Sequence, residues 1–199
     1  MCLLIETIQI NEGKIQCLEF HQNRMNTSFY ELFGFENTIN LKQYIQIPNN
    51  ALQGIWKCRI VYSRKIEEIT FTAYNYRIIN SLQLVYCNDI NYSYKYENRD
   101  YLQELQKQKQ HADEILIVKN GYITDTSYSN IAFYDGNKWV TPSTYLLKGT
   151  KREYLLQIGA IIEKQIQVSD LPKFTKARLL NCFCDLDKGN DIPIENIYM

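Results

Sequence analysis

Apolar and polar residues alternate through several stretches of the first half of the chain, and this period of two predicts β-strands with one buried face. The clearest example runs from Trp56 to Tyr62, where polar Lys57 and Arg59 interrupt the apolar positions. Turn residues separate these stretches, so neighbouring strands pair antiparallel. The predicted strands span about residues 3–10, 14–20, 56–62, 69–73 and 82–87.

One segment of the first half changes to a helical period. Between about residues 22 and 33, Met25, Phe29 and Leu32 fall on one face, and Gly34 follows where the helix should end. An amphipathic helix that covers a small antiparallel sheet is the expected result.

The second half mixes both periods. Asn120-Gly121 lies between two apolar runs and predicts a tight hairpin, because both residues tolerate positive φ, and Asp135-Gly136 repeats the signal. Residues 88–97, polar and rich in tyrosine, are interpreted as a linker. The pattern predicts a mostly antiparallel α+β fold in two lobes, a small α/β lobe over residues 1–90 and a larger one over 91–199. Its remaining elements are helices at about 98–111 and 150–158 and strands at about 115–118, 122–124, 131–134, 139–141, 161–168 and 177–182.

Composition narrows the function. The 199 residues carry 22 basic and 22 acidic side chains, and this neutral balance disfavours nucleic-acid binding. No apolar run approaches the roughly 20 residues of a membrane span, and the N-terminus lacks a signal peptide's basic region. A cytoplasmic protein with reduced cysteines is expected. Two histidines and six cysteines without a Cys-x-x-Cys pair predict no metal site.

Gly149 stands directly before the second predicted helix, in Gly149-Thr150-Lys151. A helix start exposes unpaired N–H groups, and glycine lets a ligand approach them closely, which suits a phosphate. A plain transition from loop to helix explains the same residues, so this alternative stays open.

Polar residues elsewhere have the same two possible explanations. Asp125 follows a strand and could pair with a protonated ring nitrogen, with Asn130 orienting the carboxylate, or both could be turn residues. Lys95 lies among tyrosines that could desolvate an amine nucleophile, or it is a surface charge. Arg24 could reach a phosphate or a carboxylate, or it is an exposed helix residue.

The order of these residues resembles the class IV aminotransferase family of pyridoxal-phosphate enzymes, which includes 4-amino-4-deoxychorismate lyase. The resemblance covers most of the chain. The blocks that match are Glu6-Thr7, the His-x-x-Arg helix from His21 to Arg24, Lys95-x-x-Asn98-Arg99, Ala112-Asp113-Glu114, Asp125-x-x-x-x-Asn130, Thr141-Pro142, Leu147-x-Gly149-x-x-Arg152 and Asn181-Cys182.

The resemblance implies roles for these residues. Lys95 would form the Schiff base with pyridoxal 5'-phosphate and shuttle the substrate proton, and Asp125 would keep the pyridine nitrogen charged, with Asn130 beside it. The phosphate would be held by Arg24, Gly149, Thr150, Lys151, Asn181 and Cys182. The resemblance also implies a homodimer with a small amino compound as substrate, and the composition predicts no nucleic-acid or membrane partner.

The chain departs from the family pattern in ways that bear on function. The usual glutamate is Asp125, and the helix starts Thr150-Lys151 instead of Ile-Thr. Because the chain begins at the Glu-Thr strand, we expect an N-terminally shortened fold. A lyase that releases pyruvate and p-aminobenzoate for folate biosynthesis fits Lys-x-x-Asn-Arg. A branched-chain or D-amino-acid aminotransferase and a non-catalytic relative remain alternatives.

Overall fold

The computed structural model describes residues 2–187 and 189–199, and the chain forms two compact units. The first comprises the residues up to Tyr76 together with Tyr94–Asn98, and the second comprises Arg77–Ser93 and Arg99–Met199. The division therefore differs from a single boundary after residue 90. Residues 94–98 belong to the first unit because they pair with its N-terminal strand, where Leu4 and Tyr96 form an antiparallel bridge.

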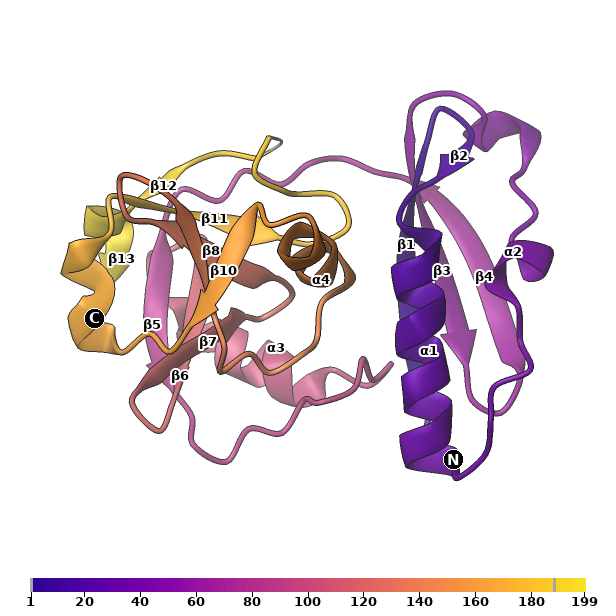
Figure 1. Cartoon of the computed structure of the whole chain (residues 1–199), viewed down its shortest axis with the longest axis horizontal. Coiled ribbons are helices and arrows are strands. Elements are labelled where there is room, and N and C mark those ends of the chain that lie inside the picture. Colours follow the sequence, from indigo (N-terminus) through magenta and orange to yellow (C-terminus); the bar gives the residue numbers. More distant parts are fainter. Residues whose placement is uncertain (1, 188) are drawn as a thin grey trace. The chain divides into compact units, whose positions relative to one another are not determined.

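The first unit is a four-stranded antiparallel sheet with helices on one face (Figure 1). The strand order is β2-β1-β3-β4, and β1 and β3 pair along their full lengths. The elements are β1 (Leu4–Asn11), β2 (Lys14–Ile15), α1 (Leu18–Phe33), α2 (Leu41–Tyr44), a 3₁₀ turn (Asn49–Ala51), β3 (Ile55–Tyr62) and β4 (Ile66–Ala73).

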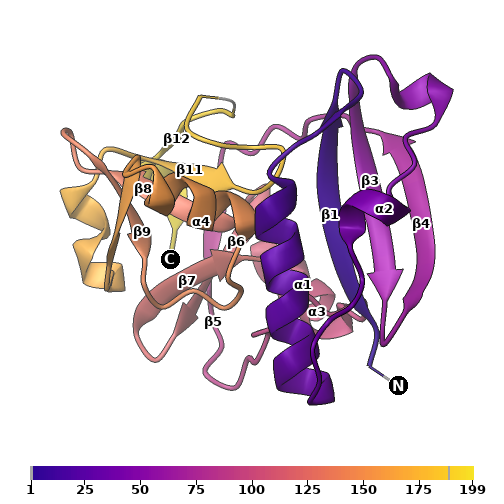
Figure 2. The same cartoon turned by 45° about the vertical axis from the view of Figure 1, so that its right-hand side comes forward.

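The core of this unit follows from the two periods of the sequence. The even-numbered residues Leu4, Ile8 and Ile10 of β1 are buried on the face that α1 covers, together with Met25 and Phe29 of the helix. Figure 2 shows α1 running along this face. Glu6 has the same parity, so its carboxylate is placed in the apolar layer as well.

The predicted strand at 14–20 is wrong beyond Ile15. Cys17 adopts a left-handed conformation with φ 49°, and α1 begins at Leu18, four residues before the predicted start. The chain turns directly into the helix because Gly13 and Cys17 both have positive φ and reverse its direction within a few residues.

The second unit contains two sheets, with strand orders β10-β9-β8-β11-β12 and β13-β5-β6-β7. Its strands are β5 (Leu82–Tyr86), β6 (Glu114–Lys119), β7 (Tyr122–Thr126), β8 (Asn130–Tyr134), β9 (Trp139–Pro142), β10 (Ile161–Lys164), β11 (Lys176–Leu180), β12 (Ile192–Pro193) and β13 (Ile197–Tyr198). Its helices are α3 (Asp100–Gln106), α4 (Thr150–Gln157) and the 3₁₀ segments Lys107–Lys109, Val168–Lys173 and Ile194–Asn196.

Alternation along β6 and β8 assigns one face of each strand to the core between the sheets and the other face to a helix. In β6, Leu116 lies in the core shared by both sheets, while Ile117 packs with α3. In β8, Ile131 lies in the shared core, while Ala132 packs with Leu155 of α4. Asn130 has the parity of Ala132, which directs it toward the α4 side.

The predicted hairpins are confirmed, with one difference in loop length. Asn120 and Gly121 have φ values of 52° and 82°, and they connect β6 to β7 in two residues. The second hairpin needs four residues because Tyr134 pairs with Trp139, and the Asp135 carboxylate accepts two backbone N–H bonds inside the loop.

The α+β class is confirmed, and most strand pairs are antiparallel. In the described part of the second unit, β5 pairs parallel with β6 and with β13, and β9 pairs parallel with β10. The predicted helix at 98–111 is shorter, and the strand at 161–168 stops at Lys164. Among the described residues, no helix has the length and hydrophobicity needed to span a membrane.

Candidate active site

A buried charged cluster occupies the helix-covered face of the first unit. The Glu6 side chain is fully buried, and its Oε1 and Oε2 accept hydrogen bonds from Arg24 Nε at 2.8 Å and Arg24 Nη2 at 2.5 Å. His21 Nδ1 lies 2.6 Å from Glu6 Oε2. A carboxylate in an apolar layer needs such partners, because its charge is costly to bury alone.

Within this cluster, the pKa values of both Glu6 and His21 are lowered, with opposite effects on their charges. Burial alone would raise the pKa of Glu6, but the Arg24 guanidinium and the hydrogen bonds from His21 and Arg24 outweigh it and lower the pKa to about 2. Burial lowers the pKa of His21, and although Glu6 raises it, the positive charges of Arg24 and Lys95 lower it further. His21 is therefore neutral at neutral pH, while Glu6 and Arg24 are charged.

The backbone of Lys95 is hydrogen-bonded to β1, the strand that carries Glu6. Its carbonyl oxygen accepts a hydrogen bond from Ile5 N at 2.9 Å, and Glu97 N donates to Leu3 O at 2.9 Å. The end of the segment that we interpreted as a linker, from Lys95 to Glu97, thus pairs with the start of β1, and Lys95 is half-buried. Within the first unit, the predicted residues Lys95 and Arg24 are near enough for both charges to act on His21.

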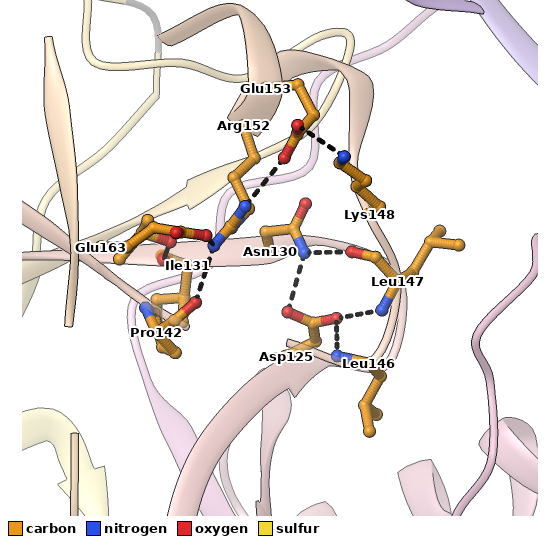
Figure 3. A network of polar contacts seen from close by, with 11 residues as sticks. Asp125, Asn130, Ile131, Pro142, Leu146, Leu147, Lys148, Arg152, Glu153 and Glu163 are labelled. Atoms are coloured by element: carbon orange, nitrogen blue, oxygen red, sulfur yellow. Dashed lines mark hydrogen bonds and ion pairs between the residues drawn. The ribbon is translucent and has the colours of Figure 1, made fainter. Parts of the chain in front are cut away.

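The second unit holds Asp125 and Asn130 in one buried network (Figure 3). Asp125 Oδ1 accepts from Asn130 Nδ2 at 2.8 Å, and its Oδ2 accepts from the backbone N–H groups of Leu146 and Leu147 at 2.9 and 3.0 Å. Asn130 Nδ2 also donates to Leu147 O at 2.9 Å. The predicted contact between this aspartate and asparagine is therefore present.

The carboxyl group of Asp125 has a raised pKa that lies just below neutral pH. Burial raises the pKa of its carboxyl group to about 6, although the hydrogen bonds from Leu147, Asn130 and Leu146 and the positive charge of Arg152 all lower it. A carboxylate offers about four acceptor sites, and these hydrogen bonds use three of them, so one acceptor site remains.

Gly149 precedes α4 as its N-cap, and the close packing of Asn130 explains why the residue is glycine. Its φ of −75° and ψ of 137° suit any residue, but a Cβ atom there would lie 1.8 Å from Asn130 Oδ1. The next residues, Thr150 and Lys151, form the first turn of the helix, whose N–H groups have no partner within the helix. The predicted helix start is confirmed.

The side chains of Asn181 and Lys151, two residues predicted to lie at the phosphate site, make contacts within the chain. Asn181 Nδ2 donates to Ser129 Oγ at 2.7 Å, and its Oδ1 accepts from the N–H groups of Phe183 and Cys184. This turn also contains Cys182. Lys151 Nζ pairs with Asp185 at 3.1 Å. Both side chains thus shape the turn that follows β11.

Two parts of this arrangement were missed by the sequence reasoning, namely the roles of Glu6 and Arg152. An acidic residue at the parity of Leu4 and Ile8 is a signal that could have identified Glu6 as a buried, paired charge. Arg152 is 1% exposed although its helix position predicted nothing unusual, because its burial depends on segments distant in the sequence. No group of three or more potential metal ligands was found among the described residues.

Comparison with known proteins assigns this chain to a family. The profile of the family described as "Amino-transferase class IV" matches residues 3–185. An uncharacterized protein of Haemophilus influenzae is 40% identical over 180 residues, which cover 89% of this chain and 96% of that protein. The chain therefore belongs to the class IV aminotransferases, and it is an enzyme of this pyridoxal-phosphate-dependent family.

Solved structures agree with this assignment. A candidate 4-amino-4-deoxychorismate lyase from Haemophilus somnus 129pt superimposes with a TM-score of 0.88 at 30% identity, covering 96% of this chain and 98% of that one. The pyridoxal-phosphate-bound form of a hypothetical aminotransferase from Mycobacterium tuberculosis has a TM-score of 0.77 at 16% identity, covering 98% and 81%. The second likeness extends to the fold alone.

Proposed function

We propose that this chain is a pyridoxal-phosphate-dependent 4-amino-4-deoxychorismate lyase, which releases pyruvate and leaves p-aminobenzoate, a precursor for folate biosynthesis. The observation that carries the proposal is the Lys95-x-x-Asn98-Arg99 segment. Its first part, from Lys95 to Glu97, pairs with β1, and in the second unit Arg99 Nη2 donates to Ser127 O at 2.6 Å. The likeness to the Haemophilus somnus protein supports it.

The residues of this chain fit the cofactor. A buried carboxylate that retains an acceptor site suits a protonated pyridine nitrogen, and a helix N-terminus preceded by a glycine suits a phosphate. When bound, pyridoxal phosphate supplies an electron sink for the substrate carbon that bears the amine. Asp125 would maintain the charge on the ring nitrogen, and Asn130 would orient Asp125.

Lys95 would hold the cofactor covalently, and its released amine would take the proton from the carbon beside the substrate amine. The electron pair of that C–H bond would complete an aromatic ring as the bond from the neighbouring ring carbon to the ether oxygen breaks, and the enolpyruvate that leaves would take up a proton at carbon to become pyruvate. Because Glu6 pairs with Arg24 in a fork, the guanidinium keeps one orientation, as a phosphate ligand requires. Thr150 and Lys151 would add backbone N–H groups.

The first test is a visible absorption titration of the purified chain with pyridoxal phosphate, followed by addition of 4-amino-4-deoxychorismate. We expect a Schiff-base band that Lys95→Ala abolishes, and p-aminobenzoate as product. Lys176→Met is the matched control, because Lys176 pairs with Asp191 at 2.8 Å on the surface of the second unit. A band without p-aminobenzoate contradicts the lyase.

A class IV aminotransferase acting on a branched-chain or D-amino acid is the second candidate, and it shares the residues that would bind the cofactor. Branched-chain aminotransferases share this fold, including the enzyme from Escherichia coli, which has a TM-score of 0.70 at 12% identity. Amino-group transfer to a keto acid in the same titration would favour it. We further propose a homodimer, which sedimentation of the purified chain would test.

A further inference from the structure

The segment that joins β9 to α4, residues 143–149, is called here the connecting segment. It has no regular secondary structure, yet anchors occur along its length. Ser143 N donates to Lys164 O at 3.0 Å, and Thr144 Oγ1 donates to Ile123 O at 2.7 Å. Near its end, the Asp125 carboxylate holds Leu146 and Leu147, as described above.

Arg152 attaches the start of this segment to the helix at its end. The side chain extends from the first turn of α4 and is 1% exposed. Its Nη2 donates to Pro142 O at 3.0 Å and also pairs with Glu163 of β10, while its guanidinium carbon lies 4.2 Å from the ring centre of Tyr145. The helix start, the end of β9 and the middle of the connecting segment are thereby joined through one side chain.

Glu153, the residue after Arg152, also joins the first turn of α4 to the connecting segment (Figure 3). Glu153 Oε1 accepts from Arg152 Nη1 at 2.9 Å, and Glu153 Oε2 lies 3.3 Å from Lys148 Nζ. Between these polar groups, Gly149 packs against Asn130. The start of α4 is consequently fixed by two sets of contacts. One runs through Asn130 to Asp125, and the other runs through the side chains of Arg152 and Glu153.

Stability alone is a poor reason for an arginine at this position. Its Nε is buried and has no hydrogen-bond partner in the part of the chain that the structure describes. A buried arginine with an unpaired donor carries a desolvation cost, and apolar residues of similar volume are often as stable in such places. What an apolar side chain would lack is the set of directional bonds to Pro142 and Glu163.

We propose that Arg152 is a positioning residue for the phosphate of the bound cofactor, an inference that rests on the proposed function. By joining the first turn of α4 to Pro142 and Tyr145, it fixes the N–H groups at the helix start before the phosphate arrives. A preformed donor set binds an anion more tightly than one that must be ordered during binding. We expect no direct contact between Arg152 and the phosphate.

The test compares two ligands that differ only in the phosphate. Pyridoxal and pyridoxal phosphate both carry the aldehyde and the ring, so a change confined to pyridoxal phosphate reports on the phosphate site. For Arg152→Met we expect the Kd for pyridoxal phosphate to rise about 10-fold or more, the lower end of the effect seen when residues behind a binding group are removed. The Kd for pyridoxal should stay within about two-fold of the wild-type value.

Two variants serve as controls. Lys176→Met removes a surface cation from the same unit and should leave both Kd values unchanged. Glu163→Gln retains the bond from Arg152 to Pro142 and should change the Kd for pyridoxal phosphate less than Arg152→Met does. Circular dichroism and thermal melting establish that each variant is folded. Should Arg152→Met fail to fold, Tyr145→Leu, which leaves the arginine's hydrogen-bond partners in place, decides the case by the same comparison.

Hydrogen exchange provides a readout independent of ligand. The N–H groups of Leu146 and Leu147 should exchange faster in Arg152→Met, while those of Ile117 and Val118 in β6 keep their rates. A folded Arg152→Met that binds pyridoxal phosphate like the wild type, or that loses affinity equally for both ligands, would overturn the inference. Absence of pyridoxal phosphate binding in the wild type would instead refute the proposed function.

Discussion

The contact between Gly149 and Asn130 allows a quantitative prediction for Gly149→Ala. A Cβ atom at this position would lie 1.8 Å from Asn130 Oδ1 and 3.0 Å from its Cγ, so the amide has to move. Moving it breaks the bonds from Asn130 Nδ2 to Asp125 and to Leu147 O. The backbone is not strained, because φ is −75°.

The magnitude follows from these two bonds. Each buried hydrogen bond contributes about 1 kcal/mol, and leaving Asp125 short of a donor costs about 1–3 kcal/mol more. Replacing glycine by alanine at a compatible φ returns about 0.4–1 kcal/mol through the unfolded chain. We therefore expect Gly149→Ala to lower the free energy of unfolding by about 2–5 kcal/mol.

Urea unfolding followed by Trp139 fluorescence, in a Trp56→Phe background, reports on the second unit, which contains both residues. The double variant is the sharper measurement. In the Asn130→Ala background the obstructing amide is absent, so Gly149→Ala should then be neutral or slightly stabilising. The reasoning is refuted if Gly149→Ala alone changes the free energy of unfolding by less than about 0.5 kcal/mol, or if it costs as much without Asn130 as with it.

Two further predictions concern the buried acids. Glu6→Gln leaves the Arg24 charge without its partner and should lower the free energy of unfolding of the first unit by about 3–5 kcal/mol. Urea unfolding followed by Trp56 fluorescence measures this change. A change below about 1 kcal/mol would contradict the ion pair's role. Because the pKa of Glu6 is lowered to about 2 from 4.5, its contribution is present above pH 4.5 and is lost as the pH falls toward 2, so the acid limb of the stability curve should flatten in Glu6→Gln. The pKa of Asp125 is raised to about 6 from 3.8, so its protonation favours folding, fully below pH 3.8, and this contribution is lost as the pH rises through 6. Asp125→Asn should therefore remove about 3 kcal/mol of the stability that the second unit gains between pH 7 and pH 4, and an unchanged pH profile would show that the carboxyl group has an ordinary pKa.

Local sequence rules were accurate where the structure is decided by neighbouring residues. The turn at Asn120-Gly121, the end of α1 at Gly34 and the start of α4 after Gly149 all lie where their residues predicted them. The rules failed at residues 14–20, where β-like alternation continues into the first turn of α1. Periodicity over so few residues does not distinguish a strand from the start of a helix.

The candidate site shows a similar division. The sequence named Asp125 and Asn130 separately, and their mutual hydrogen bond is present. It could not show that Asp125 also holds Leu146 and Leu147, because that contact joins residues about twenty positions apart through the pairing of strands. Likewise, Lys95 was predicted to lie in a linker, whereas its backbone pairs with β1.

The sequence by itself determined the secondary-structure content, the α+β class and the order of the motif residues that indicated the class IV family, since these depend on local propensity, alternation and spacing. Tertiary structure alone decided that Glu6, His21 and Arg24 share one buried cluster and that Arg152 is enclosed by Pro142, Tyr145 and Glu163. Burial and ion pairing depend on which distant segments pack together. A side chain's charge state and partners are therefore properties of the folded chain and not of its neighbours in sequence.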